Sequence, residues 1–186
     1  MKYFNTAKTL LLSATALFAV SCSNDDNGPV NEEEVITTVT TTLIGGGQVI
    51  TLTSRDLDGE GPNAPTITVS GNLTANTTYA GEVSFLNETV NPAEDITVEV
   101  EEEGVDHQVF YQLPTALGTV AYTDLDLNGK PIGLAFTLTT GNAGTGNLTV
   151  TLRHLPNKSA TGVAAGDITN AGGATDALVT YPVTVN

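Results

Sequence analysis

Two short acidic runs have the residue spacing of a calcium-binding loop. Each run places oxygen-bearing side chains at its first, third and fifth positions, namely Asp56, Asp58 and Glu60 in the first run and Asp124, Asp126 and Asn128 in the second. Such side chains can converge on one ion, and glycine at the sixth position allows the sharp turn of an EF-hand-like loop. The twelfth position is Ile67 or Ala135 rather than a bidentate carboxylate, so each run supplies half of a calcium loop. The alternative is a pair of acidic hairpin turns, which the Asn128-Gly129 dipeptide favours for the second run.

A second group of candidate ligands combines imidazole with carboxylate. His107 and His154 are the two histidines of the chain, and Glu103 and Asp106 lie just before His107. These donor types suit Zn²⁺ or another first-row divalent ion, and three protein ligands are enough for a catalytic or transport site. The alternative is a hydrogen-bonded histidine at the rim of a strand beside a solvated acidic loop. Ca²⁺ and Zn²⁺ are therefore the two candidate ions.

The chain lacks the sequence motifs of several common classes of enzyme. The sequence contains neither a His-Glu-x-x-His nor a Gly-x-Ser-x-Gly motif, and its single cysteine is Cys22. Metalloprotease, serine hydrolase and thiol mechanisms are thus not expected. The chain also has no tryptophan, which leaves few stacking platforms for a sugar. We expect a binding protein and not an enzyme.

The charge of the chain excludes one class of partner. Six lysines and arginines face 21 aspartates and glutamates among 186 residues, for a net charge of -15. Neutralising nucleic acid phosphates takes clustered basic residues, so no nucleic acid partner is expected. A strongly negative surface instead raises the local concentration of cations.

The first 22 residues have the features of an export signal and are not expected to form part of the fold. Lys2 and Lys8 precede an apolar run at 10–20, which is shorter than the roughly 20 residues that span a bilayer. This is the pattern of a secretory signal, here expected at 1–21. Residues 18–22, Phe-Ala-Val-Ser-Cys, resemble the lipobox of bacterial lipoproteins. That resemblance implies that Cys22 is acylated and that the protein is anchored to a membrane through lipid.

Residues 22–34 are polar and acidic, and they read as a solvated tether. An acidic patch directly after the lipidated cysteine resembles the signal that sends Bacteroidota lipoproteins to the cell surface. The expected location is therefore the outer face of the outer membrane. The alternative is an ordinary polar linker on a protein that faces the periplasm.

Residues 35–186 alternate between apolar and polar in short runs separated by Gly, Asn, Pro and Asp. This pattern is typical of half-buried strands, and no segment shows a helical period. We expect one all-β domain, an antiparallel immunoglobulin-like sandwich of about seven to ten strands, with a barrel as the alternative. Residues 156–175 are expected to form a long loop. The expected strands are 35–44, 48–54, 66–70, 79–86, 96–100, 108–112, 120–123, 132–139, 147–154 and 177–185.

Several segments together resemble a family of small lipoproteins of the Flavobacteria type. The resemblance covers most of the chain after the signal, and it rests on the tether and on EEVITTV (33–39), DLDGEG (56–61), NAP (63–65), FLNET (85–89) and LRHLP (152–156). Members are often labelled as type 1 periplasmic binding fold proteins and accompany TonB-dependent receptors. The two α/β lobes of that label need more residues and more helix than this chain has, so the sandwich remains the expected fold.

These observations lead to one expected function and one alternative. The expected function is that of a non-enzymatic lipoprotein of the outer membrane that captures a small ligand, a divalent cation or a metal complex, for an outer-membrane transporter. The resemblance implies that the transporter is a TonB-dependent receptor. The alternative is a structural or adhesion module in which calcium at the acidic turns serves only for rigidity.

Overall fold

The computed structural model describes residues 34–59 and 61–186, all of which fall within one compact unit. The expected signal at 1–21, the lipidation site at Cys22, most of the tether and the candidate ligand Glu60 lie outside the described residues. Within the described part of the chain, no helix has the length and apolar character needed to cross a membrane.

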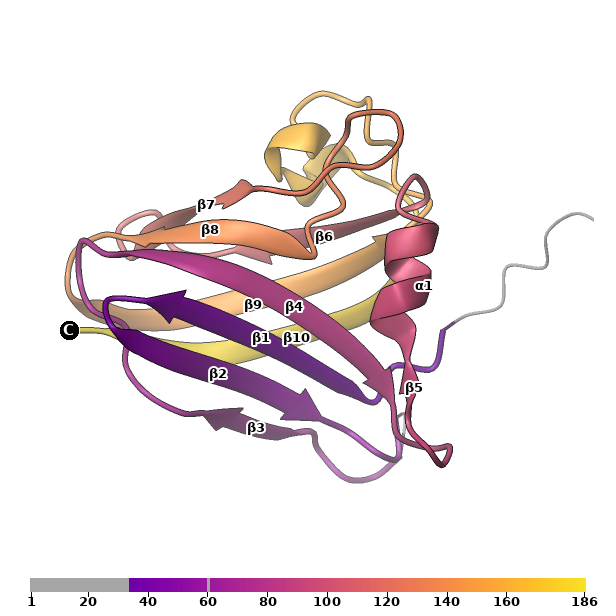
Figure 1. The fold of residues 1–186 in the computed structure, drawn as a ribbon, viewed down its shortest axis with the longest axis horizontal. Helices are drawn as coiled ribbons and strands as arrows, with labels where there is room; N and C mark the ends of the chain where they lie inside the picture. The colour runs from indigo at the N-terminus through magenta and orange to yellow at the C-terminus, as the bar shows by residue number, and fades with distance from the viewer. Residues whose placement is uncertain (1–33, 60) are drawn as a thin grey trace, which may run out of the picture. The chain divides into compact units, whose positions relative to one another are not determined.

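Two antiparallel sheets face each other (Figure 1). The first has the strand order β3-β2-β1-β4-β8-β7, with the short β5 paired to β4, and the second has the order β10-β9-β6. The expected all-β sandwich is confirmed as two separate sheets, while its immunoglobulin-like character remains a prediction. The strands are β1 (Thr38–Gly45), β2 (Gln48–Arg55), β3 (Thr66–Val69), β4 (Thr78–Asn87), β5 (Glu94–Asp95), β6 (His107–Gln112), β7 (Gly118–Tyr122), β8 (Ala135–Thr140), β9 (Gly144–His154) and β10 (Ala174–Val185).

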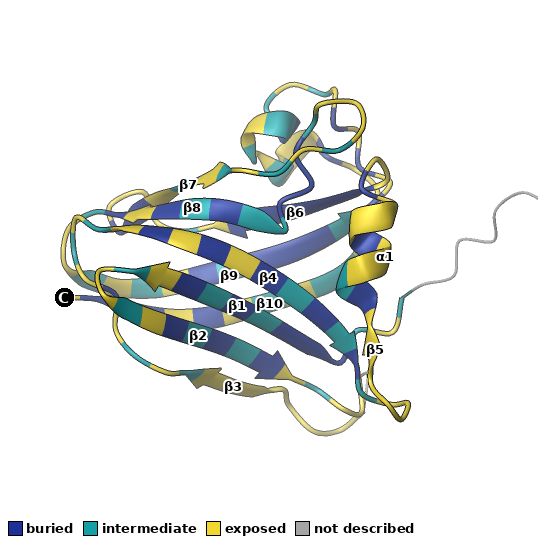
Figure 2. Cartoon of the chain, viewed as in Figure 1, coloured by how far each residue is buried: buried dark blue, intermediate teal, exposed yellow. Residues whose placement is uncertain are grey.

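The core lies between the two sheets and follows the alternation in the sequence. Phe136 and Leu138 of β8 and Leu148, Val150 and Leu152 of β9 are buried. Figure 2 shows the same alternation as buried and exposed bands along β4. Each fully buried large side chain contributes about 1.5–3 kcal/mol relative to an exposed one. The expected inward faces of these strands are thus correct.

The strand expected at 96–100 is wrong, because these residues form the helix α1 (Ile96–Glu102). Asp95 caps the helix, with its side chain accepting a hydrogen bond from the backbone N–H of Thr97 at 3.1 Å. Ile96 and Val100, four residues apart, are buried on one face, whereas Val98 is exposed. The alternation of β-branched residues therefore does not indicate a strand here. The N-cap at Asp95 and the apolar pair at positions i and i+4 stabilise a helix instead.

The long loop expected after β9 carries no strand between His154 and Ala174. It contains two short 3-10 turns, η1 (Val163–Ala165) and η2 (Ile168–Asn170). Val163 and Ala171 pack on Phe110, whose side chain points away from the main core, so this loop covers the outer face of β6. Lys158 lies in the same loop and is buried.

Candidate metal centre at one end of the sandwich

The two histidines of the chain lie side by side. The register of β6 with β9 pairs His107 directly with His154, and their rings stack with centroids 4.6 Å apart and an interplanar angle of 18°. His107 is 0% exposed and His154 is 8% exposed. The strands thus hold two imidazoles, separated by 46 residues in sequence, at the end of the core where β9 ends and β10 begins (Figure 1).

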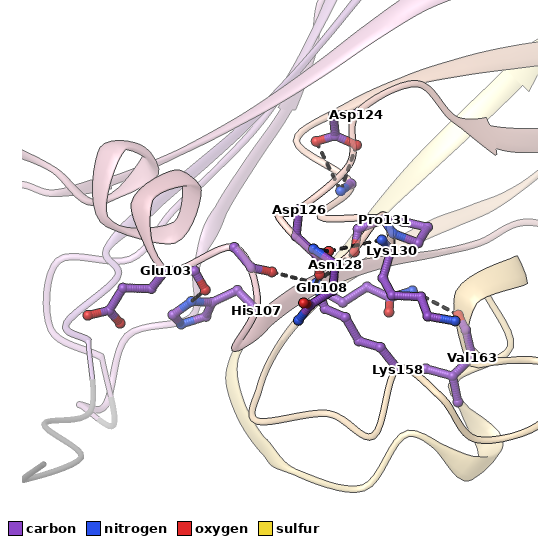
Figure 3. Close-up of polar contacts among 12 residues, drawn as sticks. Glu103, His107, Gln108, Asp124, Asp126, Asn128, Lys130, Pro131, Lys158 and Val163 are labelled. Atoms are coloured by element: carbon purple, nitrogen blue, oxygen red, sulfur yellow. Dashed lines mark hydrogen bonds and ion pairs between the residues drawn. The ribbon is translucent and has the colours of Figure 1, made fainter.

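A backbone contact orients the ring of His107. Its Nδ1 lies 3.2 Å from the carbonyl oxygen of Glu103, in the turn that follows α1 (Figure 3). A carbonyl oxygen can only accept, so Nδ1 carries a proton and donates it. This is the usual support of a metal-binding imidazole, because it leaves Nε2 to face a ligand.

Two buried carboxylates face this Nε2. Glu34 Oε1 lies 2.9 Å from it and Asp176 Oδ2 lies 4.0 Å from it, and the two acidic side chains are 5% and 2% exposed. Glu34 comes from the segment before β1. Asp176 comes from an irregularity in β10, where the register passes from Thr175 to Ala177 and leaves Asp176 as the extra residue. A bulge of this kind redirects a side chain, here toward the histidines.

Three groups of ligand atoms result, each with all its members within 4.8 Å of one another. They are Glu103 with His107 and His154, Glu34 with His107 and Asp176, and Glu34 with Glu99 and Glu103. The structure therefore brings together three of the four residues expected from the sequence. Asp106 is exposed and belongs to none of these groups within the described residues. Glu34, Glu99 and Asp176 are additional donors that the sequence reasoning missed.

The electrostatics of the centre favour positive charge. Burial lowers the pKa of His107, but the carboxylate of Glu34, the carbonyl of Glu103 and the charge of Asp176 raise it, and the net pKa is above its ordinary value. Burial raises the pKa of Glu99, and the nearby charges of Glu34 and Glu103 raise it further. A bound cation would relieve both the repulsion between the carboxylates and the cost of their burial.

Among the polar atoms of the centre that are buried without a hydrogen-bond partner within the described residues, two belong to Glu34 and His154. They are Oε2 of Glu34 and Nδ1 of His154. A buried polar atom left in this state typically costs about 1–3 kcal/mol. Both atoms carry lone pairs in the forms that bind metal, so coordination of either atom to an ion would recover the cost of that atom.

The first acidic run lies beside this end of the molecule. Asp56 accepts hydrogen bonds from the backbone N–H groups of Asp58 and Gly59, and Asp58 accepts from Asn63, so both carboxylates stabilise their own turn. Asp56 also lines a cleft of about 220 Å³ together with Asp176. The cleft lies between the start of β10 and the facing strands β1 and β2.

The carboxylate oxygens of the second acidic run already accept hydrogen bonds from other groups of the protein. Asp124 accepts hydrogen bonds from three consecutive backbone N–H groups, those of residues 133–135, at the start of β8. Asp126 Oδ1 accepts from the N–H groups of Asn128 and Lys130, at 2.8 and 2.9 Å. These contacts favour the hairpin-turn alternative for this run.

A lysine holds the remaining oxygen of Asp126. The ammonium of Lys158 donates to Asp126 Oδ2 at 2.9 Å, to the carbonyl oxygen of Pro131 at 2.8 Å and to that of Gly104 (Figure 3). Lys158 is 6% exposed and the side chain of Asp126 is 1% exposed. A protein cation thus occupies the position at which the sequence suggested a calcium ion.

Comparisons of this chain with protein-family models, with curated proteins and with solved structures found no match.

Proposed function

We propose that this chain is a non-enzymatic lipoprotein of the bacterial outer membrane that captures a divalent transition-metal ion and presents it to an outer-membrane transporter. The observation that carries the proposal is the stacked pair His107 and His154, buried beside Glu103 with all three ligand atoms within 4.8 Å. Three convergent protein ligands are the number found in zinc sites that exchange their fourth ligand.

The donor types favour a first-row transition metal over calcium. Ca²⁺ takes six to eight oxygen ligands, whereas imidazole nitrogen with one or two carboxylates suits Zn²⁺, Cu²⁺ or Ni²⁺. The hydrogen bond from His107 Nδ1 to a backbone carbonyl supports the same choice, because ligating histidines almost always donate their second ring nitrogen in this way.

The charge and the expected anchor agree with a capture role. A net charge of -15 raises the concentration of cations around the protein before any specific contact forms. An acylated Cys22 would keep the protein at the membrane in which the transporter resides. The partner in this proposal is a TonB-dependent receptor, as the family resemblance implies.

Metal binding can be tested on the full chain, purified in detergent and stripped with a chelator. Zn²⁺ should raise the temperature of unfolding because it binds only the folded state, and an excess of 100 Kd should stabilise by about 2.7 kcal/mol. Ca²⁺ should have little effect. The paired substitution His107→Gln with His154→Gln should remove the zinc response, whereas Glu101→Gln, an exposed acid of α1 outside the three groups, should retain it.

Two results would overturn the proposal. A zinc response that survives in the double histidine variant would show that the ion binds elsewhere. A response to Ca²⁺ and not to Zn²⁺ would support the structural or adhesion module instead.

A further inference from the structure

The segment that leads into the domain is attached mainly by side chains. The first backbone hydrogen bond within the described part of the chain joins Thr37 N–H to the carbonyl oxygen of Leu86 at 2.9 Å. Before it, Ile36 is half-buried and packs against the core, and the side chain of Glu34 is 5% exposed against His107. Among the described residues, the contact between Glu34 and His107 is therefore the attachment of this segment that lies farthest from β1.

That contact leaves one oxygen of Glu34 unused. His107 Nδ1 donates a hydrogen bond to the carbonyl oxygen of Glu103, and Nε2 faces Glu34 Oε1 at 2.9 Å. The second oxygen of Glu34 is buried without a hydrogen-bond partner among the described residues. Glu34, His107 and Asp176 hold three ligand atoms within 4.8 Å of one another, so a cation bound there would give this oxygen a partner.

We propose that Glu34 is a ligand of the captured ion, so that the ion also fastens the entering segment, residues 34–37, to the end of the sandwich. This inference rests on the proposed function and adds a means of release. With Glu34 in place, its carboxylate and that of Asp176 lie beside His107, the residue that this group shares with Glu103 and His154. Without it, Glu103 and the two histidines remain as a three-ligand site with an open position, from which an ion can be transferred.

Ion binding and the attachment of residues 34–37 are thermodynamically linked. If the ion strengthens the attachment of residues 34–37 by some factor, detaching this segment must weaken ion binding by the same factor. A partner that draws the entering segment away from the domain would thereby lower the affinity for the ion. The expected tether lies directly before this segment, so a force or a contact on the tether would act on Glu34 first.

The test compares zinc binding by the full chain in detergent with that of Glu34→Gln, using titration calorimetry. Glutamine keeps the size of the side chain and can donate to Nε2 of His107, so the metal-free variant should unfold at the same temperature as the wild type. Its zinc affinity should fall by at least roughly 10- to 100-fold, the loss typical of outer-shell partners, because a direct ligand is removed. Glu101→Gln should bind zinc as the wild type does.

Hydrogen exchange supplies the second readout. Zn²⁺ should slow the exchange of a peptide covering residues 34–38 in the wild type and leave the same peptide unaffected in Glu34→Gln. Wild-type affinity in Glu34→Gln, or equal protection in the two proteins, would overturn this inference. The proposed function would then stand as long as the double histidine variant fails to bind zinc, whereas a wild type that does not bind zinc would overturn both.

Discussion

Replacing Lys158 should remove a large part of the stability of the fold, and Lys158→Met tests the contribution of its buried charge. The ammonium joins three segments: the turn before β6 through Gly104, the connection between β7 and β8 through Asp126 and Pro131, and the loop after β9. Methionine keeps the unbranched shape and the apolar volume of the side chain but removes the charge and the donors. The variant therefore isolates the electrostatic contribution.

The magnitude follows from burial. Lys158 and Asp126 are 6% and 1% exposed, so the carboxylate that remains after the substitution is an almost fully buried charge without its partner. Removing one partner of a buried ion pair typically costs about 3–5 kcal/mol. Domains of this size are stable by about 5–15 kcal/mol, so Lys158→Met should remove a large fraction of the total.

Equilibrium urea unfolding of the full chain in detergent measures this loss. The chain has five tyrosines and no tryptophan, so tyrosine fluorescence reports the transition. A lower midpoint with an unchanged slope would show a loss of stability rather than a change in compactness. Lys130→Met is the matched control, because Lys130 lies on the same connection and forms no ion pair with a described residue. We expect the control to change stability by no more than about 0.5 kcal/mol.

A second substitution identifies the cause. Asp126→Asn keeps an acceptor for the backbone N–H groups of Asn128 and Lys130 but removes the charge, so it should restore part of the stability lost in Lys158→Met. Additive effects of the two substitutions would refute the ion-pair argument. A loss below about 1 kcal/mol in Lys158→Met would refute the estimate taken from burial.

The effect of pH has a definite sign. Burial raises the pKa of Asp126, but the N–H of Lys130 and the ammonium of Lys158 lower it more, and the net pKa is below its ordinary value. A lowered pKa in the folded state stabilises the fold above the ordinary carboxyl value, and this contribution is lost as the pH falls through the lowered pKa. The difference between wild type and Lys158→Met should therefore be full at neutral pH and shrink in acid.

Three further predictions concern other parts of the fold. The hydrogen bonds and charge of Arg55 lower the pKa of Glu88 from 4.5 to about 2, so Glu88→Gln should lower the unfolding temperature above pH 4.5 and converge with the wild type as the pH falls through about 2. A Cβ added at Gly81 would lie 2.4 Å from ring atoms of the buried Phe136, so Gly81→Ala should destabilise by about 1–3 kcal/mol in urea unfolding. Asp124→Ala removes the acceptor of three N–H groups, and hydrogen exchange at the start of β8 should become faster by at least about tenfold, equivalent to roughly 1.4 kcal/mol.

Strand positions could be predicted from the sequence because one face of each strand is buried. A period of two is visible wherever apolar side chains must alternate with polar ones, as in Phe136 and Leu138. The helix at 96–102 could not be recognised by the same rule, since Ile96, Val98 and Val100 alternate as in a strand. The signal that distinguishes the two states is Asp95, which caps the helix through Thr97.

Only part of the candidate site could be predicted from the sequence. His154 could be assigned to an inward position at the end of its strand, whereas His107 lies just before the expected strand 108–112. The register that stacks the two rings depends on the pairing of β6 with β9. Asp176 precedes the inward Ala177, so regular alternation places it on the outer face, and only the bulge in β10 turns it inward. Glu34 stands at the end of a run that looks like a solvated tether, and its burial depends on His107, 73 residues away.

Two buried acidic side chains among the described residues, Asp126 and Glu34, differ in the basic group that faces them. Asp126 is paired with a lysine whose ammonium also donates to two carbonyl oxygens, so its site is complete without an ion. Glu34 is paired with an imidazole, whose charge is lost once the pH rises above its pKa, even though that pKa is raised here. The carboxylate is then buried beside a neutral ring, and only a bound cation restores the balance. A chain with six basic and 21 acidic residues has few lysines that could neutralise buried carboxylates. The conditional balance at Glu34 and His107 is the physical reason to search for a bound metal ion there and not at the acidic turns.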